Sequence, residues 1–363
     1  MDIPNFLACP NGHTGRFRET ALGLTCDGCE KCFPVLLGII DFRDVDSDKT
    51  AAFSIAEDRL LAERLSAVYK DVTTFNELYD IYKALISKVK RGEELTSIGE
   101  VCSPAGESSG PRFLNQEQLV HGKAILEKIS EYVRSTTHDM PPNNIALENG
   151  CGLGLFVDGL ATHFKKLVVL DFSLCYLILA RKIAEERKLS NVTLVCGTVE
   201  RLPLQDNALD FIHSNNVIEH VSDQRALFKE AKRVLNSKGL LFVLSPNRFS
   251  LYFEPHFRLP CYGFIPKPVR RRIIRKWQHR DIDEISLLSL GELRELAVGQ
   301  FGEDVRISFI PRYLNKTVTG GYIRNILVRS LNSRMLGPIT NLLVNRALLG
   351  LMPYHTAICF KAR

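Results

Sequence analysis

From residue 143 onward, short apolar segments alternate with amphipathic ones, and this alternation constrains the fold more than any other feature of the sequence. The predicted strands cover residues 144–148, 167–171, 192–196, 209–214 and 239–245, with later ones at 305–310 and 356–360. The predicted helices between the early strands cover residues 154–163, 174–188 and 223–235. Strands and helices that alternate in this way form a doubly wound α/β fold with a mostly parallel sheet. Ligands of such sheets bind at the carboxyl ends of the strands.

The composition of the 363-residue chain fits a globular protein. Hydrophobic residues make up 45% and charged residues 24%, which excludes bulk disorder, a collagen and a multispan membrane protein. No apolar run reaches the ~18 residues that a spanning helix needs. The acidic start and the scattered cysteines predict a reduced, cytoplasmic protein without a secretory signal.

The chain divides into three predicted parts. Residues 1–45 are rich in cysteines and turns, residues 46–140 form a helical linker or cap, and residues 141–363 form the α/β domain. Helical spacing of apolar residues occurs within 46–100 and 117–134, and residues 101–115 are typical of a loop. A long insertion at about 311–354 separates the last two strands.

A glycine-rich loop follows the first strand of the α/β domain. It reads Glu148-Asn149-Gly150-Cys151-Gly152-Leu153-Gly154, and the second strand ends in Asp171. Glycines let the backbone turn tightly and approach a ligand closely. An acid about 20 residues further on can accept two ribose hydroxyls. This spacing fits a nicotinamide cofactor and S-adenosylmethionine equally well.

Five motifs in order distinguish the two cofactors. They are Glu148 to Gly154, Asp171-Phe172-Ser173, Gly197 to Leu204, Asn215 to Val221, and Arg233 to Gly239 with Ser245-Pro246-Asn247. In this order the region resembles the class I S-adenosylmethionine-dependent methyltransferases, particularly the type 11 group. The resemblance is close over about 143–250 and loose elsewhere. It implies a Rossmann-like doubly wound seven-stranded sheet and S-adenosylmethionine as the cofactor.

The resemblance also implies roles for residues of these motifs. Gly150, Gly152 and Gly154 would shape the bed for the amino-acid part of the cofactor, and Glu148 would face its ammonium group. Asp171 would hold the ribose and Phe172 the adenine. The remaining predicted cofactor residues are Thr198 and Val199 at the adenine edge and Asn215 near the sulfonium. Thr198 departs from the family pattern, which usually has Asp at that place.

Methyl transfer mainly requires alignment of an activated donor with a nucleophile, and a hydroxyl nucleophile also benefits from a base. Two histidines are candidates for this catalytic role: His220, just beyond the fourth strand, and His256, in the loop after the fifth. The alternative for His220 is a packing role. The segment Asn215-Asn216-Val217-Ile218 lacks the motif typical of methylation at a nucleobase amine.

The amino-terminal segment carries candidate metal ligands. Cys9 and His13 are followed by Cys26 and Cys29, which suits a small tetrahedral zinc site. The segment resembles the zinc-ribbon module of the small activator subunit of tRNA and protein methyltransferases, although that module usually has Cys where Gly12 stands. Cys32 is an alternative fourth ligand, and a metal-free segment held by packing is the alternative to a zinc site.

Basic residues gather late in the chain. Residues 255–280 hold eight and residues 305–363 hold nine, and neither stretch has an acid. Such a surface favours an anionic, phosphate-bearing acceptor and peripheral contact with the inner membrane face; a helical cap with a solvated basic rim is the alternative. The predicted function is O-methylation of a sugar or lipid-phosphate-linked glycan intermediate. The alternatives are an RNA methyltransferase, for which nucleic acid would be the partner, and a non-catalytic scaffold that binds the cofactor.

Overall fold

A computed structural model describes residues 3–13, 16–44, 54–90, 144–278, 282–308 and 354–361, together with a few single positions between 127 and 142. The helix predicted at 117–134 and the insertion at 311–354 lie almost entirely outside these residues. Within them, no helix is long and apolar enough to cross a lipid bilayer.

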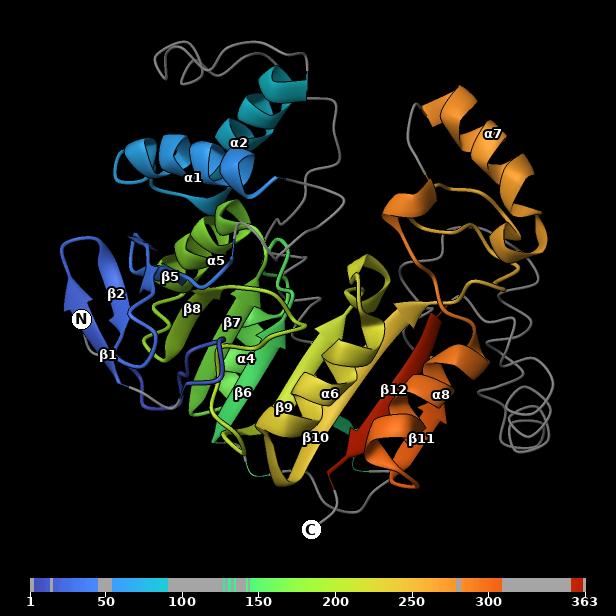
Figure 1. Ribbon diagram of the computed structural model, residues 1–363. Coiled ribbons are helices and arrows are strands. Elements are labelled where there is room, and N and C mark those ends of the chain that lie inside the picture. Colours follow the sequence, from blue (N-terminus) through green and yellow to red (C-terminus); the bar gives the residue numbers. More distant parts are fainter. Residues whose placement is uncertain are drawn as a thin grey trace.

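A mixed sheet of nine strands organises the protein (Figure 1). Its central strands are β6 (Ile145–Asn149), β7 (Lys166–Asp171), β8 (Val192–Cys196), β9 (Leu209–Asn215) and β10 (Leu235–Pro246). The strand order is β11-β12-β10-β9-β6-β7-β8-β5-β4. Neighbours from β10 to β8 pair in parallel, whereas β12 (Tyr354–Phe360) runs antiparallel between β10 and β11 (Val305–Ser308). The doubly wound sheet of seven strands that the sequence predicts is therefore confirmed.

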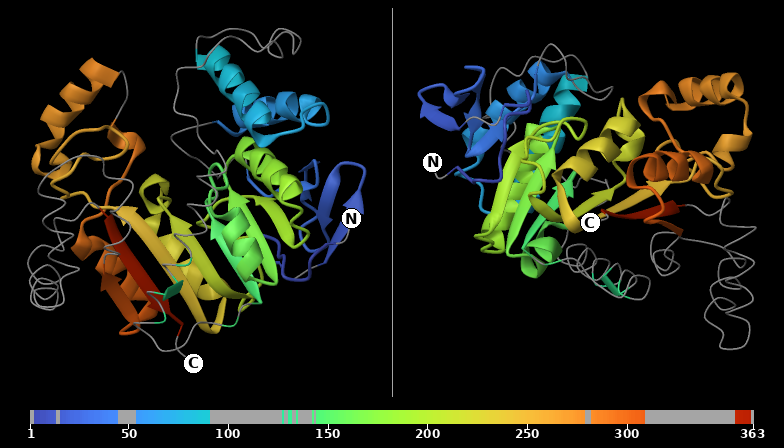
Figure 2. Two further views of the ribbon diagram at one scale, coloured as in Figure 1. Left: turned by 180° about the vertical axis from the view of Figure 1, so that it is seen from behind. Right: turned by 60° about the horizontal axis from the view of Figure 1, so that its bottom comes forward.

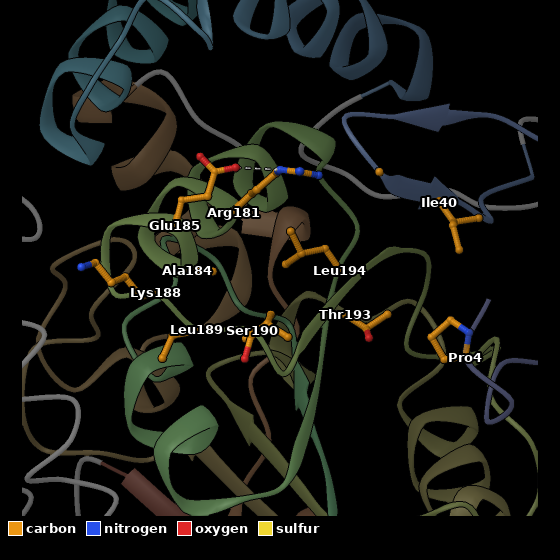
Figure 3. A pocket seen from close by; sticks show the side chains of 12 residues that line it. Pro4, Ile40, Arg181, Ala184, Glu185, Lys188, Leu189, Ser190, Thr193 and Leu194 are labelled. Carbon is orange, nitrogen blue, oxygen red and sulfur yellow. Dashed lines mark hydrogen bonds and ion pairs between the residues drawn. The ribbon is translucent and has the colours of Figure 1, made fainter. Parts of the chain in front are cut away.

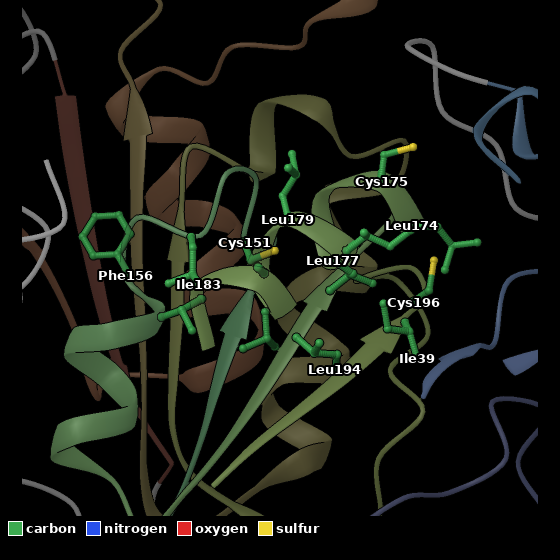
Figure 4. Packing of buried hydrophobic residues seen from close by; sticks show 14 of the residues in the cluster. Ile39, Cys151, Phe156, Leu174, Cys175, Leu177, Leu179, Ile183, Leu194 and Cys196 are labelled. Atoms are coloured by element: carbon green, nitrogen blue, oxygen red, sulfur yellow. The ribbon is translucent and has the colours of Figure 1, made fainter. Parts of the chain in front are cut away.

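Helices cover both faces of this sheet (Figures 1 and 2). One face packs on α4 (Val157–His163) and α5 (Leu174–Glu186), and the other packs on α6 (Gln224–Val234) and α8 (Leu290–Phe301). Side chains of β7 alternate between the two cores: Leu167 and Val169 face the first, and Val168 and Leu170 face the second. The first core includes the buried thiols of Cys151, Cys175 and Cys196 (Figure 4).

Two strands from the amino-terminal segment extend the sheet beyond the predicted seven. The hairpin of β4 (Val35–Leu36) and β5 (Ile39–Asp41) adds to β8, with Ile40 opposite Val195 and Asp41 opposite Cys196. An uncovered edge strand exposes unpaired backbone groups, and this hairpin covers the edge of β8. A separate antiparallel sheet contains β1 (Phe17–Thr20), β2 (Gly23–Cys26) and β3 (Cys32–Phe33).

The remaining helices stand over the carboxyl ends of the parallel strands (Figure 1). Helices α1 (Ile55–Val68) and α2 (Phe75–Lys90) pack on α5. Helix α7 (Lys267–Gln278) stands beyond the end of β10, between the short 3-10 helices η2 (Tyr262–Phe264) and η3 (Ile282–Glu284). A third short helix, η1 (Ile218–His220), follows β9. Helix α4 begins later than predicted, because residues 152–156 form turns.

Candidate active site

The glycine-rich loop turns sharply at the carboxyl end of β6. Gly150 has φ +85°, and a Cβ atom there would lie 2.5 Å from Cγ2 of Val217. The Gly150 N–H donates a 2.8 Å hydrogen bond to the carbonyl of Leu170 at the end of β7. A side chain at position 150 would therefore be strained and would also clash with the segment that follows β9.

Asp171 joins this loop to the end of β7. One carboxylate oxygen accepts from the N–H of Gly152 at 2.8 Å, and the other accepts from the N–H of Ser173 at 2.9 Å. The side chain is almost completely buried. Burial outweighs both hydrogen bonds and raises the pKa of Asp171 to about 6.

A cavity of about 310 Å³ opens between these segments. Seven of the predicted residues line it, namely Gly150, Gly152, Asp171, Phe172, Thr198, Val199 and His220. They come from the ends of β6, β7, β8 and β9, as expected for a ligand site of a doubly wound sheet. The structure thus brings most of the predicted cofactor residues and one predicted catalytic residue to one cavity.

Three predicted cofactor residues lie outside the cavity lining. Glu148 is buried within the sheet, where it bonds Nδ1 of His213 at 2.7 Å. Burial raises the pKa of Glu148, although His213 opposes this shift. Gly154 lies against α5, where a Cβ atom would approach Ile183 to 2.8 Å. Asn215 ends β9, and its neighbours Asn216 and Val217 line the cavity in its place.

The cavity also contains a carboxylate of the Gly197 to Leu204 motif to which the sequence analysis assigned no role. Glu200 lies two residues after Thr198, and its carboxylate bonds the Thr198 hydroxyl. The other carboxylate oxygen accepts from the N–H groups of Ser222 and Asp223 at 3.0 and 3.1 Å. An acid is therefore present beside Thr198, where the family pattern usually has Asp.

The two predicted catalytic histidines meet beside the cavity. Their ring centroids are 5.1 Å apart in an edge-to-face arrangement. Nδ1 of His256 bonds the carboxylate of Glu254, and its Nε2 lies 3.8 Å from Oε1 of Glu219. Burial raises the pKa of Glu219 to about 7. His220 lines the cavity, whereas His256 is not among its lining residues.

A buried ionic network contacts Phe172 and Ser173, the two residues that follow Asp171 at the end of β7. Arg43 donates to Asp41 at 2.8 and 2.9 Å, to Asp58 at 2.7 Å and to the carbonyl of Phe172 at 2.7 Å. Asp58 in turn accepts from the Ser173 hydroxyl at 2.6 Å. Burial would raise the pKa of Asp41, but Arg43 and Arg59 hold it below its usual value. Local motifs could not predict this network, because Arg43 and Asp58 are 129 and 115 positions away from their respective partners Phe172 and Ser173.

The amino-terminal cluster is confirmed as a group of side chains that could hold a metal ion. The ligand atoms of Cys9, His13, Cys26 and Cys29 lie within 4.8 Å of one another. The sulfurs of Cys9 and Cys29 are 3.7 Å apart. Nδ1 of His13 is buried and has no hydrogen-bond partner among the described residues. Cys32, the alternative ligand, lies outside the cluster on β3.

A second cavity, of about 480 Å³, lies between the amino-terminal segment and the end of α5 (Figure 3). Pro4 and Ile40 line one side, and an ion pair between Arg181 and Glu185 lies on the other. None of the predicted cofactor or catalytic residues lines this cavity.

Comparison with known proteins identifies the α/β domain. The family model described as a methyltransferase domain, type 11, matches residues 147–243. A protein of Mycobacterium tuberculosis named "Probable S-adenosylmethionine-dependent methyltransferase" is 32% identical over 119 residues, which are 32% of this chain and 40% of that protein. The ubiquinone biosynthesis O-methyltransferase of Coxiella burnetii is 30% identical over 160 residues, which are 43% of this chain and 62% of the relative.

A solved structure of phosphoethanolamine N-methyltransferase 2 from Haemonchus contortus, in complex with S-adenosyl-L-methionine, aligns with a TM-score of 0.42 and 14% identity. The alignment covers 66% of this chain and 53% of that one. The match to the family model covers the glycine-rich loop, Asp171 and His220, and therefore most of the site. Residues 147–243 therefore form a methyltransferase domain of type 11, and the chain spans less than two thirds of the length of the two curated relatives named above.

Proposed function

We propose that the protein transfers the methyl group of S-adenosylmethionine to a hydroxyl oxygen of a phosphate-bearing acceptor, specifically a sugar or lipid-phosphate-linked glycan intermediate. The observation that carries this proposal is the position of His220. It lines the same cavity as Gly150, Gly152 and Asp171 and contacts His256. The cavity therefore combines cofactor-binding residues with groups that can activate a hydroxyl acceptor.

The residues of the cavity fit the cofactor. A Cβ atom at Gly152 would have no neighbour within 4 Å, so a ligand can approach the backbone closely there, and Asp171 offers a buried carboxylate for ribose hydroxyls. Glu200 and Thr198 would accept from the adenine amine. When bound, the cofactor supplies an activated methyl group as a sulfonium, and the protein aligns the acceptor and excludes water.

The acceptor class rests on the segment from residue 247 to 278. Helix α7 carries six basic residues, of which Lys267 and Arg271 pair with Asp283. Five large apolar side chains of the same segment are exposed, namely Leu251, Phe253, Phe264, Val269 and Trp277. Cations interspersed with exposed apolar groups suit contact with an anionic membrane surface. A lipid-phosphate-linked acceptor would be presented there, close to the cofactor cavity.

We also propose a structural zinc ion at Cys9, His13, Cys26 and Cys29. Two thiolates on one tetrahedral zinc ion, each at about 2.3 Å from the metal, lie about 3.8 Å apart. The Cys9–Cys29 separation of 3.7 Å fits this geometry. Four protein ligands leave no open position, so this ion would stabilise the amino-terminal segment rather than act on the acceptor.

The test is a transfer assay with the purified protein and S-adenosylmethionine that carries a trideuteromethyl group. Lipid-linked glycans, sugar phosphates and transfer RNA serve as acceptors, and mass spectrometry locates the label. We expect label on a glycan hydroxyl, strongly reduced by His220→Gln. Label confined to RNA would replace this proposal with the RNA alternative. Cofactor binding without transfer to any acceptor would favour the scaffold.

A further inference from the structure

Glu219 is a buried carboxylate for which the described residues provide no hydrogen-bond partner. Its residue is 1% exposed, and neither carboxylate oxygen makes a hydrogen bond within the described part of the chain. Burial of a carboxylate without a compensating partner costs roughly several kcal/mol of folding free energy. Buried acids are therefore normally paired or bound to a metal ion. Nε2 of His256 lies 3.8 Å from Oε1 of Glu219. This distance is too long for a hydrogen bond.

Two imidazoles converge on this carboxylate. The ligand atoms of Glu219, His220 and His256 all lie within 4.8 Å of one another. Glu219 and His220 belong to η1, directly after β9, while His256 reaches the same place from the loop after β10. Two different segments of the chain thus bring one carboxylate and two imidazoles together at the edge of the cofactor cavity.

Glu254 holds His256 in the orientation that a metal ligand requires. Its Oε1 bonds Nδ1 of His256, and its Oε2 accepts from the N–H of Phe257 at 2.6 Å. The Nε2 atom of His256 therefore points toward Glu219. Histidines that bind metals usually donate their second ring N–H to a carboxylate in this way. Glu254 would act as a positioning residue, because it touches His256 and not the ion.

We propose that Glu219, His220 and His256 bind one divalent transition-metal ion beside the methyl-donor cavity. Two imidazoles and one carboxylate suit Mn²⁺, Fe²⁺, Co²⁺ or Zn²⁺ and leave open coordination positions. His220 lines the cavity, so an open position would face the acceptor. The thiol cluster in the amino-terminal segment would be a separate site of different chemistry.

This inference rests on the proposed methyl transfer. It adds that a bound metal ion activates the acceptor hydroxyl. A bound cation lowers the pKa of a hydroxyl that it contacts. The hydroxyl proton leaves to solvent, the oxygen forms a bond to the methyl carbon, and the carbon–sulfur bond breaks. The sulfonium thereby becomes the neutral thioether of S-adenosylhomocysteine, and no oxidant or reductant takes part.

The test measures binding of Mn²⁺ to the full chain. The protein is first stripped of metal and reloaded with one equivalent of Zn²⁺, and binding of Mn²⁺ is then followed by electron paramagnetic resonance. Because thiolates prefer Zn²⁺, the cysteine cluster should not compete for Mn²⁺. We expect one Mn²⁺ per chain in the wild type, and at least about 100-fold weaker binding in Glu219→Gln. Loss of the orienting carboxylate in Glu254→Gln should weaken binding about 10- to 100-fold.

Two exposed positions supply matched controls. Glu295→Gln on α8 and His163→Gln at the end of α4 make the same chemical changes away from the site and should bind Mn²⁺ like the wild type. Absence of Mn²⁺ binding by the wild type, or equal binding by folded Glu219→Gln, would overturn the proposed site. The labelled-methyl assay is read separately. Transfer that continues without any bound cation would overturn the metal site and leave the methyltransferase function standing.

Discussion

Replacing Arg43 by methionine tests whether the amino-terminal segment holds the residues after β7, Phe172 and Ser173, in place. Arg43 is buried between Asp41 and Asp58 and donates to the carbonyl of Phe172. Its guanidinium also lies 5.4 Å from the centre of the Phe172 ring. Methionine keeps most of the volume but removes all five donors. The change leaves two buried carboxylates without their shared cation.

Removing one partner from a buried ion pair typically costs about 3–5 kcal/mol. We expect Arg43→Met to lower the free energy of unfolding by about that amount. Arg59 still pairs with Asp41 at 2.8 Å, so Asp58 becomes the less compensated group. Asp58 accepts from the Ser173 hydroxyl and the Leu174 N–H, directly after Asp171 and Phe172. The loop that would hold ribose and adenine should therefore loosen, with about 10-fold or greater loss of cofactor affinity, equivalent to ~1.4 kcal/mol.

Urea unfolding followed by circular dichroism measures the first effect, and calorimetric titration with S-adenosylmethionine measures the second. Arg59→Met is the matched control, because it removes a partly exposed cation from the same Asp41. Such a pair contributes about 1 kcal/mol or less. If Arg43→Met is no less stable than Arg59→Met and binds the cofactor like the wild type, the supporting role of Arg43 is refuted.

Three further predictions address the remaining sites. Burial raises the pKa of Asp171 to about 6, so its ionised form prevails above pH 6. Cofactor affinity, measured by calorimetry, should therefore fall as pH drops below that value. Asp171→Asn should bind about 10-fold or more weakly at pH 8 and lose this pH dependence, and an unchanged profile would contradict the role of Asp171. Cys26→Ser should lose zinc by elemental analysis and destabilise residues 1–45, while full zinc content would exclude the proposed ligands. Trp277→Ser removes a side chain that is 71% exposed and should reduce sedimentation with anionic vesicles. The control is Leu22→Ser in the amino-terminal segment, which should reduce it less. Equal sedimentation of the two variants would refute membrane contact through α7.

The sequence was sufficient for features that depend on local pattern. The strands and helices of the α/β domain follow from apolar periodicity, and the main cavity is lined by residues of four motifs in chain order. The glycine-rich loop could be recognised because its turn requires particular residues: Gly150 has a positive φ and no room for a side chain.

Features that depend on contacts between distant segments could not be predicted in the same way. Glu148 faces His213 because β6 and β9 pair in parallel with these residues in register. Arg43 meets Phe172 across 129 positions of the chain. The convergence of His220 with His256 depends on the path of the loop after β10. Each histidine could be singled out from the sequence, but their contact, and the buried Glu219 beside them, could not.

Transfer of a labelled methyl group to a glycan is the direct test of the proposed function. The purified protein is incubated with trideuteromethyl S-adenosylmethionine and a total extract of lipid-linked glycans, and the products are analysed by mass spectrometry. We expect a labelled methyl group on a glycan oxygen with the wild type and none with Asp171→Ala. Unlabelled glycans in the presence of a protein that binds the cofactor would contradict the proposed acceptor. Label that appears equally with Asp171→Ala would contradict the assignment of the cofactor site itself.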